Sequence, residues 1–307
     1  MSSAGSWWKS PYLIGYVALY ALTLFLLHHH ERFELGEPLA VALIVGVGFS
    51  AASWWLTRQV APLPFVVKRP GPETALVVVY LILVAAFLVW GLNWTHSAFP
   101  AEPFTSVTIL VAKLIVFVLI PAAASYVLWG YRIRDYVNLT PAWRSHVWPA
   151  TGMSLLMIAF QLIFGQGPKL VRQSGFGPAT LTIAVPLAYA WLVVEVGLVE
   201  EFFFRTLLQS RLAAWLKSET GGVVVMALLF GLVHAPGFYL RPGLTMEAVG
   251  TAPSVLMAVG YSIVVTSVAG FFLGVLWART RNLPLVMAVH AAGDLVPNLV
   301  PMLKNWV

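Results

Sequence analysis

The sequence predicts an all-α protein, a polytopic bundle of about nine membrane-spanning helices. Hydrophobic residues make up 60% of the 307 residues and charged residues only 10%, whereas a soluble domain carries about a quarter of charged residues. Apolar stretches long enough to cross a bilayer also recur along the whole chain. A soluble fold of this length could not bury so much apolar surface, so we expect an integral multi-pass membrane protein.

Each predicted span is an apolar stretch bounded by turn or charge signals such as ERFELGE, GYRIRD and RTRN. The stretches lie near residues 11–27, 38–56, 74–92, 104–129, 147–165, 178–204, 222–240, 253–278 and 283–303. The fifth contains Pro149 and Gln161, so the alternative is eight spans with this helix partly embedded. The first lacks a small-residue cleavage site after its apolar run, which indicates a retained helix rather than a removed signal peptide.

The positive charges predict the orientation of the helices. One alternating set of loops contains twelve Lys and Arg residues, including Arg205 and Arg211, and the other contains five, with Lys113 left inside a span. This bias favours a cytoplasmic N-terminus. The net charge of +6 is spread over these short loops, so it indicates orientation rather than nucleic-acid binding. We expect a bacterial or archaeal cytoplasmic membrane as the location.

The chain divides into two parts of different chemical content. Residues 1–165 supply membrane helices without a motif, and 178–303 contain all the candidate site residues. The connection between them, GQGPKLVRQSGFGP, looks flexible because it is rich in glycine and polar residues. The chain has no cysteine, which excludes disulfides, thiolate nucleophiles and thiolate metal sites.

Ionisable residues inside a membrane span are costly and therefore mark candidate functional sites. In the stretch LVEEFFFRTLLQSR, Glu201 and Arg205 are four residues apart and share a helix face, so they can pair. Glu200 is rotated about 100° away from Glu201 and can point elsewhere. A structural ion pair is the alternative, but it leaves the second glutamate unexplained.

Two histidines complete the set of candidate residues. His234 follows Phe230 by four residues, and Asp294 follows His290 by four, so each pair shares a helix face. A helix-packing hydrogen bond is the alternative for His290 and Asp294. At about 1.5 Å per residue, Glu200, His234, His290 and Asp294 lie roughly 14 to 20 Å from the predicted cytoplasmic helix ends. The common depth predicts one site.

These three motifs, in this order, resemble the signatures of the CPBP (Abi, or type II CAAX prenyl endopeptidase-like) family of intramembrane glutamic peptidases. They are EExxxR at Glu200, FxxxH at Phe230, and Hxxx(N/D) at His290. The resemblance covers roughly residues 180–300, so 178–303 is predicted to be a CPBP-like catalytic core. It implies an endopeptidase that hydrolyses membrane-associated or lipid-modified proteins or peptides with an activated water and without a cofactor.

The resemblance also implies roles for the site residues. Glu200 would be the general base, assisted by His234, while Glu201 with Arg205 would hold the geometry and His290 with Asp294 would stabilise the oxyanion. Many members have asparagine at the last position. An ionised aspartate accepts hydrogen bonds but donates none, so we expect Asp294 to orient His290 and leave the imidazole as the donor.

Three other functions remain open from the sequence. A zinc-dependent metallopeptidase would bind the metal through His234, His290 and a glutamate. A proton-coupled transporter would use the same buried acids as a relay, although no two-halves repeat supports it. A membrane scaffold without activity would retain only the fold. The expected partners are membrane lipid and a peptide or protein substrate, lipid-anchored forms included.

Overall fold

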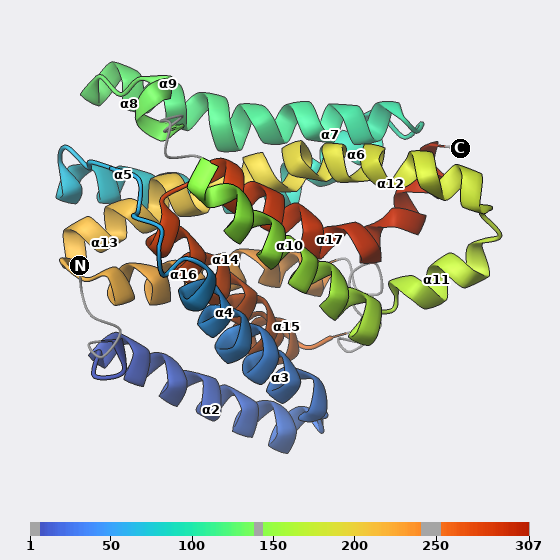
Figure 1. Ribbon diagram of the computed structural model, residues 1–307, viewed down its shortest axis with the longest axis horizontal. Helices are drawn as coiled ribbons and strands as arrows, with labels where there is room; N and C mark the ends of the chain where they lie inside the picture. The colour runs from blue at the N-terminus through green and yellow to red at the C-terminus, as the bar shows by residue number, and fades with distance from the viewer. Residues whose placement is uncertain (1–6, 138–143, 241–252, 307) are drawn as a thin grey trace. The chain divides into compact units, whose positions relative to one another are not determined.

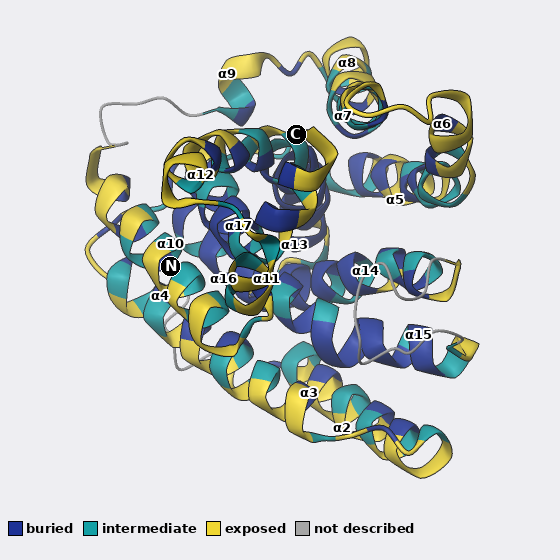
Figure 2. Ribbon diagram, turned by 90° about the vertical axis from the view of Figure 1, so that its right-hand side faces the viewer, coloured by how far each residue is buried: buried dark blue, intermediate teal, exposed yellow. Residues whose placement is uncertain are grey.

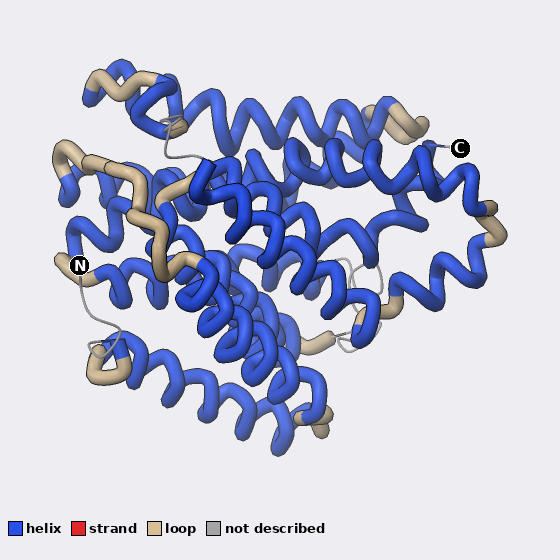
Figure 3. Tube along the Cα trace, viewed as in Figure 1, coloured by secondary structure: helices blue, strands red, loops and turns tan. Residues whose placement is uncertain are grey.

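The computed structural model describes residues 7–137, 144–240 and 253–306, and every regular element in these ranges is a helix (Figures 1 and 3). Nine helical segments within this described part are long and apolar enough to cross a membrane. They are Pro11–Glu31, Gly36–Leu56, Pro70–Ala98, Phe104–Trp129, Arg144–Phe164, Pro178–Leu216, Glu219–Leu240, Val255–Thr280 and Leu283–Trp306. The predicted all-α polytopic fold is therefore confirmed, and the chain is an integral multi-pass membrane protein.

Several spans combine α-helical and π-helical segments. A π-helical turn is rare and often occurs at functional sites. In chain order the elements of the first four spans are α2 (Pro11–Glu31), α3 (Gly36–Val41), η1 (Ala42–Phe49), α4 (Ser50–Leu56), α5 (Pro70–Ala86), η2 (Phe87–Gly91), α6 (Leu92–Ala98), α7 (Phe104–Leu114), η3 (Ile115–Leu119) and α8 (Ile120–Trp129).

The short helix α9 (Ile133–Tyr136) precedes the second group of spans. The remaining elements are α10 (Arg144–Phe164), α11 (Gly167–Ser174), α12 (Pro178–Leu192), η5 (Val193–Leu198), η6 (Glu201–Gln209), α13 (Ser210–Leu216), α14 (Glu219–Leu240), α15 (Val255–Tyr261), η8 (Ser262–Thr266), α16 (Ser267–Thr280) and α17 (Leu283–Trp306). The candidate acids thus lie in a span that contains two π-helical segments, η5 and η6.

The chain forms two compact units, each assembled from separated segments. Unit 1 contains residues 1–54, 67–90 and 207–279. Within it, α14 packs against α2, α13, α15 and η8, and α13 packs against α5. Much of α14 is buried (dark blue in Figure 2). The approach to η8 is close because a Cβ added at Gly231 would lie 2.4 Å from the backbone oxygen of Ser262.

Unit 2 contains residues 55–66, 91–206 and 280–307. Its central element is α17, which packs against α10, α11, α12 and η5. Ala184 and Ala188 of α12 and Ala291 of α17 are buried in one apolar cluster. Small side chains let membrane helices approach closely, and this approach provides van der Waals contact where lipid offers no hydrophobic driving force. The packing determines the position of the residues on α17.

The connection at 165–178 differs from its prediction. It contains the helix α11, which packs against α17 rather than forming a flexible loop throughout. A Cβ added at Gly167 would lie 2.5 Å from the backbone oxygen of Val296. Gly167 resembled a loop signal in the sequence, but it permits close contact between two helices. Glycine commonly has this role at helix interfaces in membrane proteins.

The structure also corrects the prediction for Arg211, which the sequence analysis counted among the loop charges. It lies on α13 with no exposed side-chain surface, and its Nε is 3.0 Å from Oε2 of Glu73, which is equally buried. Both residues belong to unit 1. The span that contains the candidate acids runs to Leu216 instead of ending near residue 204. A buried arginine is stable here because it has a carboxylate partner.

Candidate active site

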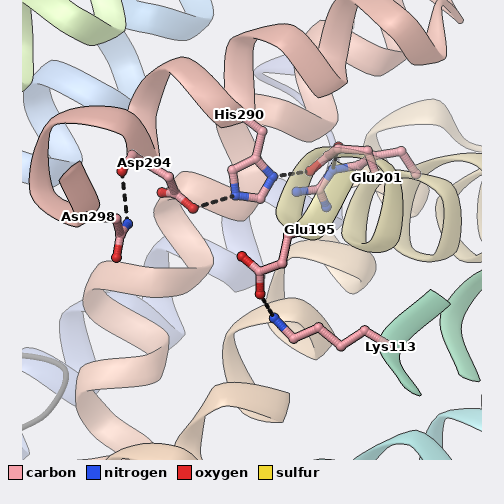
Figure 4. A network of polar contacts seen from close by, with 7 residues as sticks. Lys113, Glu195, Glu201, His290, Asp294 and Asn298 are labelled. Carbon is pink, nitrogen blue, oxygen red and sulfur yellow. Dashed lines mark hydrogen bonds and ion pairs between the residues drawn. The ribbon is translucent and has the colours of Figure 1, made fainter. Parts of the chain in front are cut away.

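Glu201 is the centre of a buried polar network in unit 2 (Figure 4). Its Oε2 accepts a hydrogen bond from Nε of Arg205 at 2.9 Å, and its Oε1 lies 2.7 Å from Nδ1 of His290. Neither Glu201 nor Arg205 has any exposed side-chain surface. The ion pair predicted from the spacing is confirmed, and both carboxylate oxygens are engaged. A buried charge that is paired in this way is stable where a lone charge would not be.

His290 receives its orientation from Glu201. Because Glu201 is paired with a guanidinium, its carboxylate acts as the acceptor and Nδ1 of His290 donates. We expected Asp294 to orient this imidazole, but its Oδ2 lies 3.9 Å from Nε2, which is too long for a hydrogen bond. The orienting partner comes from another helix because α17 packs beside the span that contains Glu201.

Asp294 lies one turn beyond His290, on the accessible side of α17. Its side chain is 35% exposed, against 11% for His290. Asn298 donates to the backbone oxygen of Asp294 at 2.8 Å, so this amide does not occupy the carboxylate. Figure 4 shows the Asp294 carboxylate on the Nε2 side of the imidazole and Glu201 on the Nδ1 side. The two ring nitrogens therefore face two different acids.

Glu200 differs from its neighbour because its carboxylate is not held by a hydrogen bond or an ion pair from the described residues. It is partly exposed, and it forms no hydrogen bond or ion pair with any residue that the structure describes. The adjacent Glu201 is buried and bonded at both oxygens. One glutamate is thus held in place, and the other is available to water or to a bound molecule.

His234 lies in unit 1, on α14. Its Nδ1 is 2.7 Å from the backbone oxygen of Phe230, and its ring centroid is 4.8 Å from that of Phe230. A carbonyl oxygen only accepts hydrogen bonds, so Nδ1 is the donor and Nε2 of the neutral ring is a free acceptor. The shared face of Phe230 and His234 is confirmed. The convergence of His234 with the residues of unit 2 stays a prediction.

A glycine sets the distance between the two helices that carry Glu201 and His290. A Cβ added at Gly197 would lie 2.8 Å from the backbone oxygen of Met287 and 3.1 Å from its Cα. Gly197 precedes Glu201 by four residues, and Met287 precedes His290 by three. The close approach therefore lies about one helical turn from the Glu201–His290 hydrogen bond, and it permits that bond to form.

We expect Gly197→Ala to separate these helices and weaken the site. The added methyl would clash with backbone, so overpacking should lower the free energy of unfolding by about 1–3 kcal/mol. A displacement of about 1 Å at the site could reduce the rate of cleavage about a hundredfold. Thermal unfolding and peptide cleavage by the purified protein measure both effects. Gly15→Ala is the control, because no atom lies within 4 Å of its added Cβ. Unimpaired cleavage by the Gly197 variant would contradict the expectation.

The structure adds two residues to the neighbourhood of the site. Lys113 of α7 forms an ion pair with Glu195 of η5, and Figure 4 shows the Glu195 carboxylate between Lys113 and His290. From the sequence, Lys113 was left inside a span without a partner on another helix. The sequence signal for this ion pair was one acidic and one basic residue in two separate apolar spans, because a charged side chain within the membrane needs a partner.

The fold and these contacts define a class: an integral membrane protein with a glutamate–histidine–arginine network buried in its spans. Residues 180–296 match the sequence model of the type II CAAX prenyl endopeptidase Rce1-like family. This segment is thus similar to the CPBP family of CAAX proteases, which its three motifs also resemble. No curated protein and no solved structure shows a match to the chain.

The match of this segment supports a protease in general terms, a hydrolase whose substrate is a peptide or a protein. All six predicted site residues fall inside the matched segment, together with Glu195, whereas Lys113 lies outside it. Among the described histidine, aspartate and glutamate residues, no three are grouped so that they could hold a metal ion.

Proposed function

We propose that the chain is an intramembrane endopeptidase in which Glu200 is the general base. The observation that carries this proposal is the difference between two adjacent glutamates. Glu201 is committed to Arg205 and His290, whereas Glu200 is partly exposed and has no polar partner among the described residues. A general base must reach a water molecule and accept its proton, and Glu200 is the glutamate with free oxygens.

In the proposed step, a Glu200 oxygen takes a proton from water, and the water oxygen attacks the scissile carbonyl carbon. The carbonyl electron pair moves onto its oxygen and forms a tetrahedral oxyanion. Collapse of this intermediate breaks the carbon–nitrogen bond, and the proton held by Glu200 passes to the leaving nitrogen. The products are a new carboxylate and a new amine, and no covalent intermediate forms with the protein.

The two histidines have separate parts in this proposal. His234 assists the base, because its Nδ1 hydrogen bond to Phe230 leaves Nε2 as an acceptor for a proton of the same water. His290 keeps Nδ1 on Glu201, and in its protonated form it presents Nε2–H as a donor to the oxyanion. A fixed donor is effective in a site of low dielectric because it needs no reorganisation during the reaction.

Glu201, Arg205 and Asp294 support the histidine on α17. The Glu201–Arg205 pair fixes the Nδ1 side of His290, and both of its residues are fully buried. The more exposed Asp294 carboxylate faces the Nε2 side at 3.9 Å. We propose that it keeps the donor side of the imidazole directed into the site, which is an electrostatic function that needs no direct hydrogen bond.

We propose a membrane-associated protein or peptide as the substrate, with lipid-modified and prenylated forms included. The match of residues 180–296 to a family of prenyl endopeptidases supports this class. We also propose a cytoplasmic N-terminus in a bacterial or archaeal membrane, because Lys and Arg are distributed ten to five over alternate loops once Arg205 and Arg211, two of the twelve, are assigned to the span Pro178–Leu216. Reporter fusions to successive loops would test this orientation.

Cleavage of a library of membrane-anchored peptides by the purified full chain tests the proposal. We expect the wild type to release fragments, to contain no stoichiometric metal and to keep its activity after strong chelation. Loss of activity on removal of one bound zinc ion would support the metallopeptidase alternative instead. Absence of any cleavage by the folded wild type would favour a transporter or a scaffold.

A further inference from the structure

A second ion pair lies within the spans of unit 2, beside the candidate site. Nζ of Lys113 contacts Oε1 of Glu195, and the two side chains are 17% and 19% exposed. Lys113 is nine residues beyond the start of α7, which places it about 14 Å into its span. A lysine at this depth is too far from the span end to be an ordinary interfacial anchor.

The pair is close enough to influence the residues on α17. Figure 4 shows the Glu195 carboxylate between the ammonium of Lys113 and the side chains of His290 and Asp294. The charges of Glu195 and Lys113 both act on the Asp294 carboxyl. In a medium of low dielectric such charges interact strongly, so the position of Glu195 matters for the Asp294 carboxyl, which faces Nε2 of His290.

Each of the two cations in this region is paired with one glutamate. Arg205 is committed to Glu201 and Lys113 to Glu195. Glu200 and Asp294 remain without a hydrogen bond to their carboxylates among the described residues. Without Lys113, the Glu195 carboxylate would lose this cation and could turn to contact the imidazole of His290, which Figure 4 shows beside it. That contact would occupy Nε2, the nitrogen that the proposed reaction needs.

We propose that Lys113, which lies outside the family-matched segment, is a positioning residue of the active site. It acts through Glu195 by holding that carboxylate away from His290, so that Nε2 stays available. This inference rests on the proposed function, because it assigns a reactive role to His290. It also gives the motif-free front half of the chain a part in catalysis, since α7 supplies a charge that residues 180–296 lack at this point.

Steady-state cleavage by four variants of the full chain tests the proposal. We expect Lys113→Met to lower kcat about ten- to a hundredfold with little change in KM, an effect typical of residues that orient a reacting group. Lys113→Arg should recover most of the activity because it restores the cation. Glu195→Gln should lower kcat only a few-fold. The double variant Lys113→Met with Glu195→Gln should be more active than Lys113→Met alone, because the misplaced charge is gone.

The control is Lys304→Met, which removes an exposed lysine from the end of α17 in the same unit. Thermal unfolding of each sample separates positioning from loss of fold. If Lys113→Met does not fold, the inference still requires a folded double variant with substantial activity. Wild-type kcat in Lys113→Met, or a double variant no better than Lys113→Met, would overturn the inference.

The same experiment distinguishes failure of this inference from failure of the proposed function. If Glu200→Gln is inactive but Lys113→Met is normal, the reaction stands and the positioning role is wrong. If Glu200→Gln cleaves normally, Glu200 is not the general base, and if the folded wild type cleaves no peptide, the proposed endopeptidase function is wrong, whatever Lys113 does.

Discussion

Glu200→Gln is expected to lower kcat by about a thousandfold, the middle of the range for a lost general base. The substitution keeps the shape of the side chain and removes its ability to take a proton. Stability should change little, because Glu200 has no hydrogen bond or ion pair with a described residue to lose. The measurement is single-turnover cleavage of a membrane-anchored peptide, with thermal unfolding of the same sample.

Glu34→Gln is the matched control for this variant. Glu34 is exposed between α2 and α3 in unit 1, so the same exchange of carboxylate for amide takes place outside the unit that contains Glu200. It should leave both cleavage and unfolding at wild-type values. A Glu200→Gln protein that cleaves as fast as this control would show that another group accepts the proton.

Glu201→Gln is expected to damage stability and activity together. The amide cannot neutralise Arg205, which would remain as a fully buried guanidinium. Its NH₂ group would also face donors, since both Glu201 oxygens now accept hydrogen bonds from Arg205 and His290. Breaking a buried pair on one side costs about 3–5 kcal/mol. We therefore expect a free energy of unfolding lower by this amount and a folded fraction with little cleavage.

Glu73→Gln provides a control for the stability effect alone. Glu73 and Arg211 form a second fully buried carboxylate–guanidinium pair, in unit 1, and neither is a candidate site residue. Loss of the Glu73–Arg211 pair should lower the free energy of unfolding by a similar amount of about 3–5 kcal/mol. The folded fraction of Glu73→Gln should keep the wild-type kcat. If Glu201→Gln also retained normal kcat, the Glu201–His290 bond would have no part in the reaction.

The sequence was sufficient to predict the helical spans and the family that residues 180–296 match. Nine apolar stretches correspond to the nine candidate spans of the described chain, because the cost of exposing polar backbone to lipid makes long apolar helices the main solution. Glu201–Arg205 and Phe230–His234 were also predictable. Partners four residues apart share a face whatever the helix packs against, so local spacing is enough.

Other features could not be predicted from local patterns. The segment at 165–178 resembled a flexible loop, yet it contains a helix, α11, that packs on α17. Arg211 resembled a loop cation, yet it is buried with Glu73 from 138 positions earlier in the chain. In both cases the deciding contact joins residues that are distant in sequence, and a window of neighbouring residues carries no information about it.

The sequence by itself determined the class of fold, the three motifs and the pairing within each helix. Only the tertiary structure decided which glutamate is committed, because the second bond of Glu201 comes from His290, on a different helix. It also joined Lys113 to Glu195 across two spans. Contacts between helices depend on how closely the backbones approach, as at Gly197 and Met287. That distance results from the packing of whole helices rather than from any local spacing.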